Sequence, residues 1–371
     1  MPTFIIIGAG ILGASTAYHL AKQGADVTLI DRNDPSQATA AAAGIVCPWL
    51  TNRRNKPWYR LVTEGAKYYP ALIQKLENDG EMETGYARVG AINIFDTKEK
   101  LNNKMDLARQ RQANTPEMGD VTALSPAETK ALFPPVSDGY RAVHISGAAR
   151  VNGSALCDAL IRGAEKNGAS VIRGNASLMS QGSTITGATV NGENYYADQV
   201  IVTGGAWAKD LLTPLGKNVL VTPQKAQIVH LNIPHTDTAS WSVLMPPYNQ
   251  YMLTFGGGKV VVGATQEDNA GFDERVTMGA VHEMFDKALK VAPGLSSSTY
   301  VETRVGFRPF TPGHLPIIGP VPHTEGLLIA NGLGASGLTS GPYLGLELAK
   351  LALGQPTDLD LDDYDVTSAF G

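Results

Sequence analysis

The chain has 371 residues, enough for two domains, and 43% of them are hydrophobic, as in ordinary globular proteins. Its 30 basic and 35 acidic residues leave a net charge of −5, which argues against nucleic acid as the main partner. Neither the two cysteines, Cys47 and Cys157, nor the seven histidines have metal-ligand or redox spacing, so we expect no metal site. No signal peptide and no apolar run long enough to span a bilayer is visible, so we expect a cytoplasmic protein.

The first elements along the chain are a strand, a helix and a second strand. The short apolar run 4–7 predicts a strand buried on both faces, and apolar residues at helical spacing over 11–21 predict a helix. A second strand follows over 26–30 and is closed by Asp31. This order is typical of the start of a nucleotide-binding unit.

Three glycines lie at the turn from the first strand to the helix. Gly8 permits the turn, Gly10 lets the backbone approach a pyrophosphate, and Gly13 lets helix and strand pack closely. Asp31 follows Gly13 by 18 residues, near the spacing at which an acid accepts a ribose hydroxyl. The combination predicts a site for an adenine dinucleotide; the alternative is a helix–strand contact that merely needs small residues.

Three further segments are rich in small residues: SQATAAAAGIV at 36–46, VIVTGGAWA at 200–208 and NGLGASGL at 331–338. The last one precedes a predicted helix with Ser340 as candidate N-cap and Pro342 at its start. No second strand and acid follow it, so it is not a second nucleotide site. A glycine-rich helix start can lie against a flavin ring and stabilise its negative charge, or it can be a simple turn. Four such segments favour the long cofactor FAD over NAD.

One arginine, Arg308, stands in the proline-stiffened segment VGFRPFTPGHLPIIG. Strand alternation places it on one face with Glu302, Arg304 and Gly306. Glu302 and Arg304 can pair, which leaves Arg308 without a nearby acid. Its forked donors suit a substrate carboxylate; the alternative is an ion pair with an acid distant in sequence.

Taken together, these motifs resemble the FAD-dependent amine and amino-acid oxidoreductases of the D-amino-acid oxidase superfamily, which includes glycine oxidase, sarcosine oxidase and D-amino-acid dehydrogenase. The similar segments are GAGILG, LIDR, TAAAAGI, RVNGSAL, VIVTGGAWA, TPQKAQ, VVVGATQEDNAGFDERVT, GFRPFTPGHLPIIG and NGLGASGL. The resemblance implies an α/β fold in which a Rossmann-like FAD-binding domain is interleaved with an antiparallel-sheet substrate domain. The FAD-binding domain is expected from residues 1–85, 145–220 and 305–371, and the substrate domain from 86–144 and 221–304.

The resemblance also implies site residues. Arg308 is expected to bind the substrate carboxylate. Tyr248 and Tyr251 are candidates to line the pocket; the alternative is that both pack within the sheet. The expected cofactor contacts are Gly8, Gly10, Ile11, Leu12, Gly13, Asp31, Arg32, Thr39, Ala42, Ala43, Gly44, Ile45, Ala176, Thr203, Gly204, Gly205, Trp207, Arg308, Gly334, Ala335, Ser336, Gly337, Leu338 and Thr339.

Two positions depart from the sarcosine oxidase pattern. Gly306 stands where those proteins attach FAD to a cysteine, so FAD is expected to bind non-covalently. Val261 stands where they carry an oxygen-activating lysine, with Lys259 two residues away. Both an oxidase and a dehydrogenase therefore stay open.

The expected function is oxidation of a small amino acid, a D-amino acid or a glycine-like amine, by hydride transfer to the flavin. The product is an imino acid that hydrolyses to a keto acid and ammonia. The alternative is a dehydrogenase of a secondary amine or 2-hydroxy acid that passes electrons to a quinone or carrier. The expected partners are a carboxylated amine and O₂ or another electron acceptor, with a homo-oligomer possible.

Overall fold

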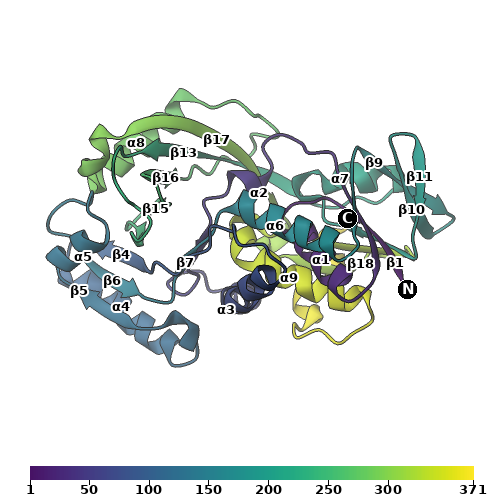
Figure 1. Cartoon of the computed structure of the whole chain (residues 1–371), viewed down its shortest axis with the longest axis horizontal. Helices are drawn as coiled ribbons and strands as arrows, with labels where there is room; N and C mark the ends of the chain where they lie inside the picture. The colour runs from purple at the N-terminus through teal and green to yellow at the C-terminus, as the bar shows by residue number, and fades with distance from the viewer.

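The structure, a computed structural model, describes all residues 1–371 and has two lobes between which the chain passes repeatedly (Figure 1). One lobe is built on a six-stranded sheet in the order β18-β19-β12-β1-β2-β8. All neighbours in it are parallel except β18 and β19. Its strands are β1 (Thr3–Ile7), β2 (Asp26–Asp31), β8 (Ser170–Arg173), β12 (Gln199–Val202), β18 (Ile317–Pro320) and β19 (Leu327–Asn331).

The predicted strand–helix–strand start is confirmed as β1, helix α1 (Ile11–Lys22) and β2. Phe4 to Ile7 are buried, as a central parallel strand requires, and α1 is buried along most of its length. The helix lies between two others, α6 (Gly153–Lys166) and α9 (Gly337–Ala352). This lobe therefore has the expected Rossmann-like α/β architecture.

Helix α9 begins earlier than the sequence predicted. Ser336 is its N-cap residue and it starts at Gly337, so Ser340 and Pro342 lie inside it. Pro342 lacks the N–H that would bond the carbonyl four residues before it, at Leu338. The hydroxyl of Tyr69, on helix α3 (Lys56–Asn78), donates to that Leu338 carbonyl instead. The proline is tolerated inside the helix because a neighbouring helix supplies the missing donor.

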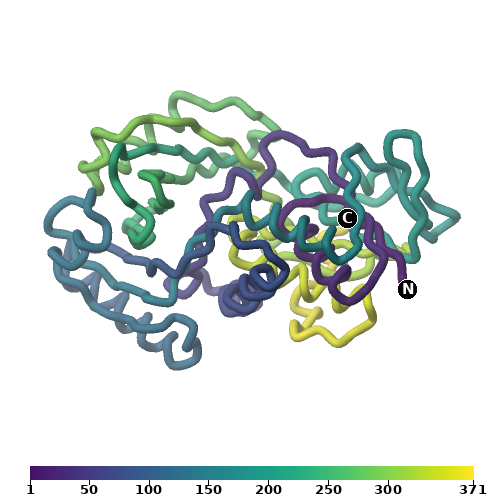
Figure 2. The backbone as a smooth tube through the Cα atoms, in the orientation of Figure 1, coloured from purple at the N-terminus to yellow at the C-terminus, as the bar shows by residue number.

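The second lobe is built on an eight-stranded sheet in the order β17-β13-β16-β15-β14-β4-β6-β5. Its pairings are antiparallel except between β14 and β4. Strands from two distant stretches of the chain lie side by side in it (Figure 2). They are β4 (Ala91–Phe95), β5 (Val121–Leu124) and β6 (Arg141–Ile145), and β13 (Thr222–Asn232), β14 (Val243–Met245), β15 (Tyr251–Thr254), β16 (Lys259–Gly263) and β17 (Thr299–Phe310).

Strand β17 forms one edge of this sheet and runs continuously through residue 305, where the second-domain boundary was predicted. Strands β15 and β16 form an antiparallel hairpin. Helix α8 (Met278–Val291), capped by Thr277, packs on one face of the sheet against Val229, Val260 and Val262. The other face is turned toward the first lobe.

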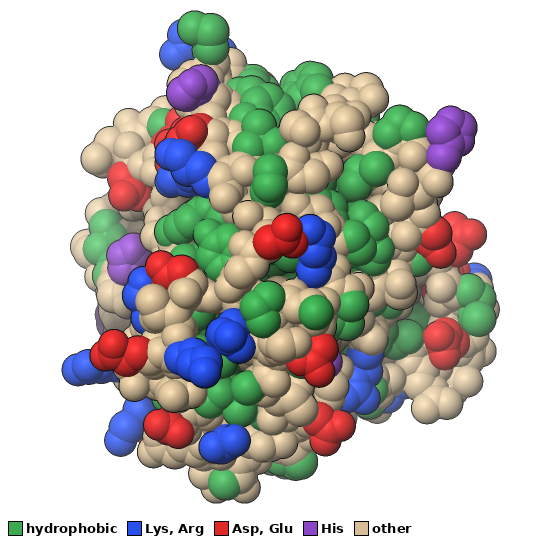
Figure 3. All heavy atoms as spheres, turned by 90° about the vertical axis from the view of Figure 1, so that its left-hand side faces the viewer, with side chains coloured by type: hydrophobic (Ala, Val, Ile, Leu, Met, Phe, Trp, Pro, Cys, Tyr) green, Lys and Arg blue, Asp and Glu red, His purple; other side chains and the backbone are tan.

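The remaining elements connect or flank the two sheets. They are α2 (Ala38–Ala41), α4 (Lys98–Gln112), α5 (Pro126–Leu132), α7 (Ala208–Leu212), the pair β3 (Ile45–Val46) and β7 (Ala149–Arg150), and the three-stranded sheet β9 (Ala176–Gln181), β10 (Thr184–Val190) and β11 (Glu193–Tyr196). No helix combines the length and apolar character needed to cross a bilayer. On the face of the second lobe in Figure 3, acidic and basic side chains are intermixed with hydrophobic ones.

Candidate functional site

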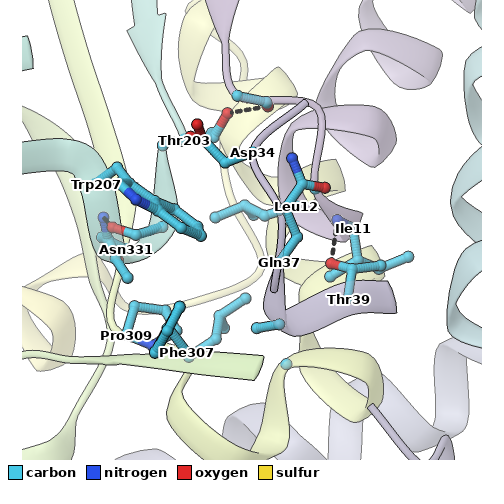
Figure 4. A pocket seen from close by; sticks show the side chains of 18 of the residues that line it. Ile11, Leu12, Asp34, Gln37, Thr39, Thr203, Trp207, Phe307, Pro309 and Asn331 are labelled. Atoms are coloured by element: carbon cyan, nitrogen blue, oxygen red, sulfur yellow. Dashed lines mark hydrogen bonds between the residues drawn. The ribbon is translucent and has the colours of Figure 1, made fainter. Parts of the chain in front are cut away.

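A cavity of about 460 Å³ lies between the two sheets. Its wall includes the residues that follow or end β1, β2, β12 and β19, together with the inner faces of β13 and β17. Figure 4 shows Leu12, Thr203, Trp207, Asn331 and Phe307 gathered from these separate elements around one space. The carboxyl ends of parallel strands are where open α/β sheets bind ligands.

At two positions of the first glycine-rich turn, Gly8 and Gly13, the surrounding protein leaves no room for a side chain. Gly8 has φ +110°, and a Cβ there would lie 2.6 Å from the Thr203 carbonyl oxygen. A Cβ on Gly13 would overlap the Gly8 carbonyl oxygen, so Gly13 serves packing rather than the cavity wall. Thr203 fastens the turn by donating its hydroxyl to Gly8 at 2.7 Å.

Gly10 differs from these two glycines. Its φ is −66°, and the nearest atom to a Cβ there would be Thr39 Oγ1, at an ordinary 3.4 Å. Nothing in the protein excludes a side chain at this position, although it lines the cavity at the start of α1. The helix leaves its first N–H groups without intrahelical partners, and only that of Ile11 is taken, by Thr39 at 3.0 Å. This turn is a cradle suited to a pyrophosphate.

Asp31 lies on the cavity wall at the end of β2. Its carboxylate accepts from the Ala9 amide at 2.6 Å, the Asn33 amide at 2.6 Å and the Gln37 side chain at 3.0 Å. The carboxylate thus ties the glycine turn to the loop after β2. Beside it, Arg32 pairs with Asp34 and Asp210, so this end of the cavity is the polar one.

The second glycine-rich turn is fastened to the VTGGAW turn by Asn331, a buried residue that sequence reasoning missed. Its side chain donates to the Gly205 carbonyl at 2.9 Å and accepts from the Gly332 amide at 2.7 Å. The start of α9 therefore borders the cavity at Gly337, Leu338 and Thr339. The positive end of its dipole therefore lies at the cavity wall.

Arg308 reaches the cavity from the inner face of β17. The predicted Glu302–Arg304 pair is present, with Arg304 Nε donating at 2.8 Å. No carboxylate lies within ion-pair distance of Arg308, which donates from Nη1 to Gln224 Oε1 at 3.1 Å. Its charge is therefore unneutralised by the chain, as the sequence predicted.

The two predicted pocket tyrosines are placed differently. Tyr251 lines the cavity; burial raises the pKa of its hydroxyl, and the adjacent Arg308 guanidinium opposes that rise. Tyr248 lies outside the cavity, where it donates to the Lys287 carbonyl at 2.8 Å on α8, and burial raises its pKa to about 12. The loop before β15 turns the Tyr248 ring to the opposite side of the sheet, so it does not reach the pocket.

The structure brings the predicted cofactor residues onto one cavity wall, except Gly13 and Ser336. Ser336 accepts from the Trp58 indole at 3.2 Å instead. Several wall residues were missed because no glycine or charge pattern marks them; they are Gln37, Gly174, Asn175, Leu178, Phe307, Pro309 and Asn331. Of these, Asn331 had a usable signal, since it is a polar residue ending a buried strand.

The cavity wall fits FAD held without a covalent bond. It offers a phosphate cradle at Gly10, an acid at Asp31 and a helix start at Gly337, in separate parts of one space. No cysteine lines it. A Cβ on Gly306 would lie 2.7 Å from the Ala41 side chain, so a cysteine at this position would require a shift of α2.

Comparison with known proteins gives consistent matches. A family model described as "FAD dependent oxidoreductase" (DAO) matches residues 3–351. The chain is 59% identical over 370 residues to the protein named "Uncharacterized oxidoreductase YurR" of Bacillus subtilis (strain 168), covering 100% of both. It is 28% identical to a glycine oxidase of Pseudomonas aeruginosa over 97% of both chains.

Two solved structures are similar over nearly the whole chain. The crystal structure of iminodiacetate oxidase (IdaA) from Chelativorans sp. BNC1 superposes with a TM-score of 0.94 at 45% identity, covering 98% of both chains. That of glycine oxidase from Geobacillus kaustophilus superposes with a TM-score of 0.85 at 25% identity, covering 100% of both.

Proposed function

The chain belongs to the FAD dependent oxidoreductase family (DAO), with FAD as its cofactor, and we propose that it oxidises a small carboxylated amine. The substrate is an amino acid such as glycine or a secondary amine that bears a carboxylate. Glycine oxidase and iminodiacetate oxidase, named for substrates of this kind, are among its relatives and structural neighbours. A 2-hydroxy acid is the alternative.

The observation that carries this proposal is the unneutralised Arg308 on the cavity wall. A guanidinium can hold a carboxylate with two parallel hydrogen bonds, and such charge-assisted bonds contribute roughly 1.5–3 kcal/mol. Tyr251, next to Arg308, stays neutral because burial raises its pKa, so its hydroxyl can donate to the same carboxylate.

The charges on the wall also select the form of the amine. The acidic residues that line the cavity are Asp31, Asp34 and Asp210, and Arg32 pairs with the last two at the nucleotide end. On the face of β13 that meets Arg308, the small and apolar residues Ala226 and Ile228 line the wall. An ammonium group would find no anionic partner there, so this region favours the uncharged amine.

Bound FAD would supply the oxidising chemistry, removal of a hydride from the substrate Cα, and water would hydrolyse the resulting imine to a carbonyl compound and ammonia or a primary amine. The protein supplies orientation for this step. Arg308 and Tyr251 fix one end of the substrate, and the apolar wall restricts the other. No acid–base pair is needed at the substrate end.

The test is anaerobic titration of the purified flavoprotein with glycine, D-alanine, sarcosine, iminodiacetate and glycolate. We expect one or more of the amines to bleach the flavin absorbance and glycolate to leave it unchanged. Bleaching by glycolate alone would instead support the hydroxy-acid alternative. Reoxidation by O₂ and by a soluble quinone then identifies the electron acceptor.

Arg308→Ala should raise the KM for the active amine by about 10- to 100-fold, since one charge-assisted contact is removed. The control is Arg54→Ala, because Arg54 is exposed and lies outside the cavity wall. An unchanged KM in Arg308→Ala would contradict the role proposed for this arginine.

A further inference from the structure

Arg308 is held by a short chain of side chains that leads away from the cavity. Its guanidinium donates to Gln224 Oε1 at 3.1 Å, and Gln224 Nε2 donates to Asp268 Oδ1 at 2.8 Å. We propose that Gln224, oriented by Asp268, is a positioning residue that fixes Arg308 while leaving its charge available to a substrate carboxylate. The proposal rests on the carboxylate-binding role of Arg308 proposed above.

The register of two strands brings these side chains together. Gln224 on β13 and Arg308 on β17 are direct cross-strand partners. Side chains opposite each other on an antiparallel pair point to the same face, so both extend along the inner face of the sheet. The contact therefore follows from backbone pairing and does not need a rare rotamer.

Asp268 decides which end of the Gln224 amide faces the arginine. An ionised carboxylate only accepts hydrogen bonds, and a guanidinium only donates them. The NH₂ end of the amide must therefore meet Asp268, and the carbonyl oxygen must meet Arg308. With the amide reversed, both contacts would set like groups against each other.

An amide side chain is suited to position 224, where it must contact Arg308 without neutralising its charge. A glutamate at 224 would form an ion pair with Arg308 and neutralise the charge that recruits the substrate. An apolar residue would leave the guanidinium without an acceptor on that side. Glutamine provides an acceptor but no net charge. The only acid in this row of three side chains is Asp268, and Gln224 separates it from the guanidinium.

Asp268 is exposed, but its position is fixed by the loop that carries it. The loop 264–277 is anchored on β13 by Lys225, which is fully buried and lies 3.2 Å from Asp273 and 3.7 Å from Glu267. Backbone bonds in both directions join Lys225 to Glu267, the residue before Asp268. Gln227 adds a bond to Glu267 at 2.7 Å. Strand β13 thus holds both ends of the Gln224–Asp268 contact.

The experiment uses the FAD-loaded full-length protein with acetate as the anionic probe and acetamide as the neutral one. Binding of each is followed by the change in the flavin absorption spectrum. The variants are Gln224→Glu, Gln224→Met and Asp268→Ala. The matched control is Gln266→Met, because Gln266 is exposed on the same loop and lies outside the cavity wall.

We expect Gln224→Glu to weaken acetate binding by about tenfold or more, because it neutralises Arg308. Gln224→Met and Asp268→Ala should weaken it about three- to tenfold, since the guanidinium loses its fixed orientation. Acetamide affinity should stay within about twofold in all variants, as should acetate affinity in Gln266→Met. With the active amine, the KM should rise while kcat is largely kept, since a saturating substrate reorients Arg308.

Two results would overturn the inference. Acetate affinity within about twofold of the parent protein in both Gln224 variants would show that Arg308 needs no such partner. Equal loss of acetate and acetamide would show a general structural role. Arg308→Ala, measured alongside, separates the two proposals. If this variant still binds acetate, the role proposed for Arg308 is wrong. If this variant loses acetate binding while the Gln224 variants keep it, only the role proposed for Gln224 is wrong.

Discussion

At the scale of single residues, the three glycines of the first turn differ in whether the protein has room for a side chain at their positions. Gly8 and Gly13 are required by the chain, because a Cβ at either would collide with backbone oxygens of Thr203 or Gly8. Gly10 is not required by the chain, because a Cβ there would meet Thr39 Oγ1 at 3.4 Å. We therefore expect any need for glycine at this position to come from the bound cofactor.

Gly10→Ala should consequently fold but lose FAD. Alanine adopts φ −66° without strain, so the free energy of unfolding of the apoprotein should change by less than about 1 kcal/mol. The FAD dissociation constant should rise by at least about tenfold, because the methyl group occupies space that the pyrophosphate needs. Fluorescence titration of apoprotein with FAD measures this dissociation constant, with Gly279→Ala at an exposed position of helix α8 as control. Undiminished FAD affinity would place the phosphates elsewhere.

Tyr251→Phe should raise the KM for the active amine about three- to tenfold by removing one hydrogen bond to the carboxylate. Burial raises the pKa of Tyr251 above its ordinary value of 10.0, so the hydroxyl is protonated throughout the neutral range. The pH profile of kcat/KM between about pH 6 and 9 should therefore have the same shape in both proteins. A lost inflection in Tyr251→Phe would show that this tyrosine titrates during turnover.

At the scale of elements, the start of α9 depends on α3. Pro342 cannot bond the Leu338 carbonyl, and the fully buried Tyr69 supplies the donor from α3. Leu338 also lines the cavity, so the same contact supports the predicted flavin end of the site. Sequence periodicity predicts both helices but gives no information on this contact between them.

Tyr69→Phe should lower the free energy of unfolding by about 1–3 kcal/mol, because the buried Leu338 carbonyl is left without a donor. FAD should dissociate faster as well, since the first turn of α9 loses its support. Urea denaturation and release of FAD on gel filtration measure the two effects. Tyr195→Phe, on the exposed three-stranded sheet, is the control. A stability equal to that of the control would show that water or another group serves the carbonyl.

At the scale of the whole molecule, stability should depend on buried histidines. Burial lowers the pKa of His19 from 6.5 to about 3, and burial followed by Arg304 lowers that of His230 to about 4. Both are neutral when folded and take up a proton on unfolding below about pH 6.5. Their contribution to the free energy of unfolding is complete above about pH 6.5. It is lost as the pH falls toward the pKa values that the two histidines have in the folded protein.

We therefore expect the free energy of unfolding to fall between about pH 6.5 and 5, by up to about 1.4 kcal/mol per pH unit for a fully buried histidine such as His19. His19→Gln should reduce this slope by nearly that amount. Urea titrations at several pH values measure this pH dependence of the free energy of unfolding. An identical slope in the variant would show that His19 is already protonated in the folded protein.

Sequence alone predicted the features that local rules determine. The strand–helix–strand start, the glycine turns and the unpaired Arg308 follow from periodicity, spacing and the absence of a nearby acid. Gln224, Asp268 and Asn331 could not be found in this way, because their contacts depend on strand register and on how a loop returns to its sheet. Tyr248 was misplaced for a related reason, since the residue precedes its strand and alternation does not fix its direction.

The repeated passage of the chain between lobes has a consequence for how the protein is made. The eight-stranded sheet receives its edge strand only at Thr299–Phe310, and the six-stranded sheet its β19 only at Leu327–Asn331. During synthesis neither lobe can close until nearly the entire chain has left the ribosome, because these strands pair with partners made much earlier. A chain that ends at residue 298 should therefore resemble a folding intermediate in which both sheets are incomplete. It should not contain one finished domain followed by a tail.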